Sequence, residues 1–322
     1  MHSPPTSIKY VLRWLALFIL VYALLSLGAL FSSQQLIASV SALPLTLLGE
    51  FILLITASFA LRTARWCYLT RRLNPQVPLR VAAEIYIGGF PMTLTPGRIG
   101  ELWRAWALVK QHGSNYRRCL PLVLCDRLLD LNILLLFAAL GIVATLSIYR
   151  LPAVAALLLI LPFLLLLLKP NWCRQILKIL WFASGKRLSR QFAALLAICR
   201  CMKRIVHPAT YLPALLLSLF AWLIEAFAIY HIAMQLGGTL LLANAMTILG
   251  LGNIVGVLTF LPGGIGGQEA TLVYLLQQSG NTLSLALIVT GVARIGTIFY
   301  AALLGLPFFI KYSRLAKLSL TI

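Results

Sequence analysis

Two short stretches of this sequence decide how the chain can fold: they read TLTPGRIG at residues 93–100 and TFLPGGIG at residues 259–266. Proline removes a backbone donor from a helix and glycine weakens it, so each stretch should interrupt a helix. Both stretches lie inside long apolar segments, 81–110 and 241–279. The half-segments on either side of each break are too short to cross a bilayer, which needs about 20 apolar residues. The sequence therefore predicts two broken helices rather than two continuous spans.

The rest of the chain is equally apolar. Hydrophobic residues make up 61% of its 322 residues and charged residues only 11%, with a mean hydropathy of +0.95. A chain of this size has too much exterior to hide so much apolar surface in a soluble core. A soluble enzyme, a disordered chain and a disulfide scaffold are thus excluded. Six further segments are long enough to be full spans: 10–31, 44–69, 119–148, 151–168, 208–235 and 284–310.

The basic residues predict an orientation. The chain has 27 Lys and Arg against 7 Asp and Glu, a net charge of +20. If the N-terminus is inside and each broken segment returns to its own side, every basic cluster falls in a cytoplasmic connection and only Arg150 lies outside. The 81–110 hairpin then opens to the cytoplasm and the 241–279 hairpin to the outside. We expect both termini in the cytoplasm and a cell inner membrane location. The charge needs no nucleic-acid partner.

The two broken segments also resemble each other. At an offset of 166 residues, Pro96 lies over Pro262, and with one inserted residue Arg127 lies over Arg294. Three crossings separate the two copies in the predicted topology, so the copies would be inverted. Inverted repeats with broken helices are typical of secondary transporters, and their breaks line the binding cavity. The alternative is two independent kinks that ease packing.

The predicted fold is therefore an all-α polytopic membrane protein with six full transmembrane helices and two re-entrant broken-helix hairpins in an inverted repeat. It forms one membrane domain over 1–322. We divide it into an N-terminal helix and outer loop (10–43), repeat 1 (44–148), a fourth span with a basic amphipathic cytoplasmic connection (149–207), and repeat 2 (208–311).

These segments resemble the transmembrane region of the lysylphosphatidylglycerol synthase family, also called the flippase-like domain family. The resemblance runs from about 44 to 311 and is carried by PGRIGEL at 96–102, DRLLD at 126–130, LPGGIG at 261–266, Glu269 and Arg294. It implies a polytopic lipid translocator. The fused family members continue into a soluble aminoacyltransferase domain, whereas this sequence ends at Ile322, so we expect no lysyl transfer and no enzyme activity.

The sequence departs from the family pattern, or from its own symmetry, at two positions. Asp126 stands where some family members carry Glu. Gly264 stands in the second copy where the first has Arg98, so one anion-binding side chain has no symmetric counterpart.

Ionisable residues inside a membrane are costly and are functional candidates by default. Arg127 lies about nine residues into its span, roughly 13 Å, and Arg294 about ten residues, roughly 15 Å, which places both near the midplane of a 30 Å core. The predicted substrate-binding residues are Arg98, Glu101, Arg127, Asp130, Glu269 and Arg294. The predicted break residues are Pro96, Gly97, Gly100, Pro262, Gly263, Gly264 and Gly266. No motif indicates a catalytic residue, a metal or a cofactor.

The roles of these charges stay open at this point. Glu101 and Glu269 each begin a half-helix, where they could cap it and pair with Arg127 and Arg294. Alternatively the arginines hold a phosphate and the acids compete for them.

The neighbouring charges give further expectations. Asp126 and Asp130 share a helix face that does not include Arg127, so we expect those acids to pair with other helices. We expect Arg62 and Arg65 to reach the cytoplasmic interface, and Trp103 and Trp106, which flank Arg104, to mark it. Glu225 has no basic neighbour in sequence. It would be a protonated buried acid or would meet a basic residue of the other repeat.

The sequence favours an inner-membrane lipid translocator, of flippase or scramblase type, for an anionic or phosphate-linked headgroup. Its partners would be membrane lipids. The alternatives are a secondary transporter of small solutes and a non-transporting membrane partner of a glycosyltransferase or lipid-modifying enzyme. A headgroup transferase acting inside the membrane is a weaker alternative than these two.

The cytoplasmic orientation of the first hairpin can be tested by cysteine labelling. A Gly97→Cys variant should react with a membrane-impermeant maleimide added from the cytoplasmic side, because the hairpin opens there. Labelling only from outside would contradict the predicted topology.

Overall fold

The computed structural model describes residues 44–112, 116–145, 175, 178–179, 181–182 and 207–318. All regular structure in these ranges is helical. Three helical stretches in them are long and apolar enough to cross a membrane: Leu45–Leu73, Pro208–Gln235 and Leu283–Arg314. The predicted spans 10–31 and 151–168 lie outside the described residues, as does nearly all of the amphipathic connection.

The helices follow the predicted segments closely. In the first part they are α3 (Leu45–Leu73), α4 (Leu79–Gly88), η1 (Phe90–Leu94), η2 (Pro96–Leu102), α5 (Trp103–His112) and α6 (Tyr116–Thr145). In the second part they are α10 (Pro208–Gln235), α11 (Leu242–Leu258), η3 (Pro262–Gly264), α12 (Gly267–Gln278), α13 (Leu283–Arg294), the π-helical η4 (Ile295–Tyr300) and α14 (Ala301–Leu318).

The helix ends have local causes. Pro44 and Pro78 hold extended backbone just before α3 and α4, and α10 begins with Pro208 at its first turn, where a missing N–H costs nothing. Arg71 and Arg72 lie in the last turn of α3, where cations interact favourably with the helix dipole. Because α3 has 29 residues, it extends about 44 Å, well beyond a 30 Å hydrocarbon core.

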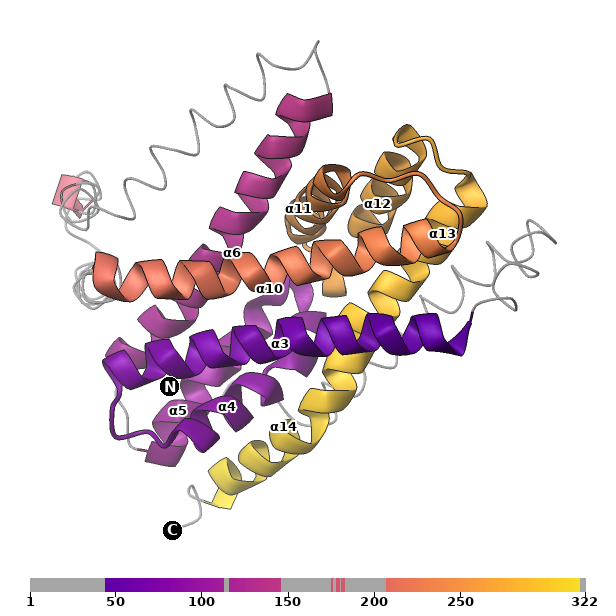
Figure 1. Ribbon diagram of the computed structural model, residues 1–322. Helices are drawn as coiled ribbons and strands as arrows, with labels where there is room; N and C mark the ends of the chain where they lie inside the picture. The colour runs from indigo at the N-terminus through magenta and orange to yellow at the C-terminus, as the bar shows by residue number, and fades with distance from the viewer. Residues whose placement is uncertain are drawn as a thin grey trace.

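Two pairs of helices organise the interior. The long helices α3 and α10 lie side by side and antiparallel (Figure 1). Helix α6 packs along α11, so the first and second parts of the chain contact each other directly. The continuous α13–η4–α14 stretch runs diagonally past α3 in Figure 1, from α13 above it to α14 below it, and α14 packs against α4.

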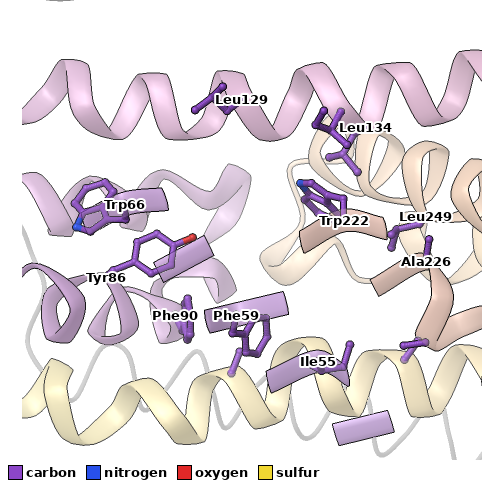
Figure 2. Packing of buried hydrophobic residues seen from close by; sticks show 14 of the residues in the cluster. Ile55, Phe59, Trp66, Tyr86, Phe90, Leu129, Leu134, Trp222, Ala226 and Leu249 are labelled. Carbon is purple, nitrogen blue, oxygen red and sulfur yellow. The ribbon is translucent and has the colours of Figure 1, made fainter. Parts of the chain in front are cut away.

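An aromatic cluster joins α3 to the first broken segment. The ring centroids of Phe59 and Phe90 are 5.0 Å apart, those of Tyr86 and Phe90 5.4 Å, and those of Trp66 and Tyr86 5.5 Å. All four rings are buried, and Figure 2 shows them facing one another between the helices. Tilted and edge-on ring pairs add to the burial of apolar area, so this cluster fixes how α4 and η1 approach α3.

The predicted interruptions are present in both segments. In the first, Thr95 is extended, and Gly97 (φ 58°, ψ 16°) and Arg98 (φ 56°, ψ 21°) are left-handed. In the second, Leu261 is extended and Gly263 is left-handed (φ 61°, ψ 9°). Gly264 and Gly266 also have positive φ, 71° and 83°. Glycine adopts this region without strain, whereas an arginine there is uncommon.

The two interruptions meet each other. A Cβ atom on Gly97 would lie 3.0 Å from the ring of Phe260, which precedes the second break. η2 and η3 are in contact, and η2 also touches α11 and α6. Two sites of irregular backbone, far apart in sequence, therefore share one place in the fold.

The close packing of α14 on α4 yields a stability prediction. A Cβ atom on Gly305 would lie 2.4 Å from the Ile87 carbonyl oxygen and 2.5 Å from Pro91 Cδ. Gly305→Ala must therefore displace backbone, and we expect a loss of about 1–3 kcal/mol, seen as a lower thermal midpoint in detergent. Gly49→Ala is the control, because no atom lies within 4 Å of its Cβ position and alanine favours a helix. Equal melting of both variants would contradict this packing.

Candidate functional site

A polar cavity lies where the two interruptions meet. Its volume, counted as space open to the centres of water molecules, is about 70 Å³, enough for several waters. Five arginines line it: Arg62, Arg98, Arg104, Arg127 and Arg294. The acids in the lining are Glu101 and Glu225. The lining residues as a whole come from α3, the two broken segments, α6, α10, α13, η4 and α14, so the cavity draws on both parts of the chain.

Arg65 is a fully buried charge beside this cavity. One guanidinium nitrogen lies 2.6 Å from Asp130 Oδ1 and the other 2.6 Å from Asp126 Oδ1, and the first also donates to Ser218 Oγ. The side chains of Arg65 and Asp126 have no exposed surface. The prediction that Arg65 reaches the interface was wrong: its α3 position faces α6 and α10, and two carboxylates hold it there.

Arg127 joins α6 to the first interruption. Its Nε lies 3.0 Å from Glu101 Oε2, and its Nη2 lies 2.8 Å from Asp126 Oδ2 and 3.2 Å from Asp130 Oδ2. The expected Glu101–Arg127 pair is therefore confirmed. The expectation that Asp126 and Asp130 pair with other helices is confirmed by Arg65 of α3, and Arg127 in addition folds back over its own helix to reach both acids.

Arg104 completes this group. It is buried, 3.6 Å from Glu101 Oε2 and 3.5 Å from Asp126 Oδ2, and its guanidinium lies over the ring of Tyr86 at 4.2 Å. Trp103, next to it, is buried as well and packs against Phe309 with the two rings tilted, rather than marking an interface. Arg104 was not predicted as a site residue, because the tryptophans beside it were interpreted as marking the membrane interface.

α10 contributes an aromatic and an acid to the lining. Arg62 forms an ion pair with Glu225 and lies over the ring of Trp222, 3.8 Å from its centroid. The Trp222 indole N–H donates to Asp130 Oδ1 at 3.0 Å. Of the two expectations for Glu225, the structure supports the second, a basic partner from the first part of the chain. Arg62, expected at the interface, lies instead on the cavity wall.

Arg294 holds the second interruption together. Its Nε donates to Glu269 Oε1, its Nη1 to Gln268 Oε1 and its Nη2 to the Gly263 carbonyl oxygen, each at 2.6 Å. Glu269 also accepts from the Gly266 N–H at 2.8 Å and so caps α12. The expected Glu269–Arg294 pair and the capping role are both confirmed.

Arg98 differs from the other arginines. Its Nη2 donates to Asn253 Oδ1 at 3.3 Å, and within the described residues no carboxylate lies within 4.0 Å of its guanidinium. Asn253 is buried on α11, and its Nδ2 donates to the Leu249 carbonyl oxygen at 2.9 Å. The partner of Arg98 is thus an uncharged amide from the second part of the chain.

Comparison with known proteins bears on this arrangement. A family model described as the lysylphosphatidylglycerol synthase TM region matches residues 13–305, which include both interruptions and every arginine of the cavity. The chain belongs to this family. It is also similar to a UPF0104 membrane protein of Methanothermobacter thermautotrophicus, 24% identical over 287 residues that cover 81% of this chain and 83% of the relative. No solved structure matches it.

This family member is therefore a membrane protein, and the match covers the transmembrane region of the synthase family alone. Of the predicted site residues, Arg98, Glu101, Arg127 and Arg294 line the cavity, whereas Asp130 and Glu269 lie behind it and hold Arg127 and Arg294. Asn253 and Gln268 were missed, since a lone amide in an apolar helix gives no signal. Within the described ranges, no cluster of three His, Cys, Asp or Glu side chains could hold a metal.

The buried triad around Arg65 leads to a second stability prediction. Arg65→Met should cost about 3–5 kcal/mol, because it removes the fully buried cation that hydrogen-bonds both Asp126 and Asp130. Arg80→Gln is the control, since the Arg80 side chain is 88% exposed and its pair with Glu84 should contribute little. The thermal midpoints of both variants measure the expected loss of stability. An Arg65→Met midpoint at the wild-type value would show that the triad is not needed for stability.

Proposed function

We propose that this protein is a lipid translocator that moves an anionic headgroup between the leaflets through the cavity at the two interruptions. The observation that carries the proposal is the composition of the cavity wall, where five arginines face two glutamates at the point of irregular backbone. Guanidinium groups are well suited to phosphate because they present paired donors in one plane. A dry apolar interior would have favoured an accessory role instead.

We further propose the inverted-repeat architecture of six spans and two re-entrant hairpins, with repeat 1 over 44–148 and repeat 2 over 208–311. The likeness of the interruptions supports it: Gly97 and Gly263 have nearly the same φ and ψ. The Glu101–Arg127 and Glu269–Arg294 pairs support it as well, since their partners are separated by 26 and 25 residues. Each hairpin would then be held to its own repeat by one Glu–Arg pair.

The size of the cavity bears on how a lipid would move. A space of about 70 Å³ holds a small polar group but not an acyl chain. We therefore propose that the headgroup passes between the hairpins while the tails stay in the bilayer. The hairpins would part when the Glu–Arg pairs open. The headgroup phosphate would then replace the glutamate as the anionic partner of the arginine.

A partnership with a lipid-modifying enzyme or a glycosyltransferase remains a prediction from the family resemblance. The inner-membrane location and the cytoplasmic termini are also predictions, and these two rest on the distribution of basic residues.

Translocation can be measured in proteoliposomes that contain a fluorescent phosphatidylglycerol, with quenching of the outer leaflet by a membrane-impermeant reductant. The wild type should expose inner-leaflet lipid to the quencher. Arg127→Ala should abolish this, and Arg294→Ala should do so as well, because both remove a cavity cation. Transport at the wild-type rate by both variants would contradict the proposal.

The folding of Arg294→Ala needs its own control, because Arg294 binds three acceptors of the second interruption. The double variant Glu269→Gln with Arg294→Gln removes both charges together and leaves none unpaired. We expect it to melt near the wild-type temperature and to be inactive.

A further inference from the structure

The charges around the cavity do not balance. Within the described residues, the network contains six arginines, at 62, 65, 98, 104, 127 and 294, and five carboxylates, at 101, 126, 130, 225 and 269. Every one of these arginines except Arg98 lies within 4.0 Å of a carboxylate. The network thus carries one positive charge in excess, and that charge is located on Arg98. An uncompensated charge at membrane depth is costly.

The backbone at Arg98 also differs from that of the other five arginines. Its φ of 56° is in the left-handed region, where an arginine is uncommon, and Gly264 has the matching conformation with φ 71° in the second interruption. Glycine would therefore suit position 98 better than arginine does. A strained residue that glycine could replace indicates that its side chain has a function.

Asn253 keeps this cation available. Its Nδ2 is bound to the Leu249 carbonyl, so the amide is oriented with Oδ1 toward Arg98. An amide oxygen accepts the hydrogen bond but leaves the positive charge uncompensated. An aspartate at the same place would neutralise it, as Glu101 and Glu269 do for Arg127 and Arg294.

We propose that Arg98 is the binding site for one singly charged phosphodiester group, and that Asn253 is a positioning residue that holds the site open. This inference rests on the proposed translocator function and names the headgroup class that it takes. The single excess charge favours a phosphodiester, which carries one negative charge, over a phosphomonoester or a diphosphate, which carry more. Arg127 and Arg294 already have carboxylate partners in the same wall, so Arg98 makes the first contact with the phosphate.

The inference can be tested by native mass spectrometry of the purified full chain, with lipids added at equal concentration. The probes are phosphatidylglycerol, a diester with one charge, and phosphatidic acid, a monoester. Wild-type protein should retain phosphatidylglycerol in preference to phosphatidic acid. Arg98→Gly should retain at least tenfold less phosphatidylglycerol while melting at or above the wild-type temperature, because glycine relieves the left-handed backbone.

Asn253→Asp is the second variant. It keeps Arg98 in place but supplies an internal anion, so it should lose phosphatidylglycerol to a similar extent. Arg80→Gln is the matched control, since it removes one positive charge at an exposed position outside the cavity; it should bind as the wild type does. Wild-type retention by both Arg98→Gly and Asn253→Asp, or preference for phosphatidic acid, would overturn the assignment.

A third probe separates a lipid from a free headgroup. Glycerophosphoglycerol, the deacylated form of the same diester, should compete poorly if the site serves a lipid. Displacement at equal concentration would support the phosphodiester site while contradicting the translocator.

Failure of the site and failure of the function are distinguishable. If the wild type translocates lipid in liposomes and Arg98→Gly still binds phosphatidylglycerol as the wild type does, only the proposed site is wrong. Binding that depends on Arg98 without translocation would overturn only the function.

Discussion

The structure depends on the need to compensate buried charge. Carboxylates are few in this chain, yet a large share of them converge on one place, where Arg65, itself without exposed surface, binds Asp126 and Asp130. Such ions are costly to bury unless each finds a partner and hydrogen bonds. That requirement ties α3, α6 and α10 to one another and to the first interruption, and it ties α13 to the second. The apolar faces of these helices could slide past one another, but the ion pairs fix one register.

The interruptions and the ion pairs support each other. A left-handed turn exposes backbone groups that a membrane cannot solvate, and side chains must satisfy them. Arg294 does so for the Gly263 carbonyl, and Thr95 does so for the Gly100 N–H at 2.8 Å. The irregular backbone therefore exists because polar side chains surround it, and those side chains stay inside because the irregular backbone needs them.

Much of this could be predicted from the sequence, and the limits have physical reasons. The Pro-Gly pattern predicted the position of both interruptions, and apolar length predicted both ends of α10 and the start of α3 to within one residue, although α3 ends four residues later than predicted. The Glu101–Arg127 and Glu269–Arg294 pairs followed from order and spacing. Arg62, Arg65 and Arg104 were misplaced because a charge near a helix end can either reach water or turn inward. Which of these two positions a charge of α3 takes depends on the packing of α3 against α6 and α10. Hydrophobic periodicity does not show which helices are neighbours.

The difference between Arg98 and Gly264 has a consequence for any cycle in which the two hairpins exchange roles. Two identical halves would give inward-facing and outward-facing states of equal free energy, each occupied half the time. An arginine on one hairpin and a glycine on the other remove that equality, and a difference of about 1.4 kcal/mol already makes one state tenfold more populated. In such a cycle this one difference would help to give the molecule a preferred resting side before any substrate or gradient acts on it.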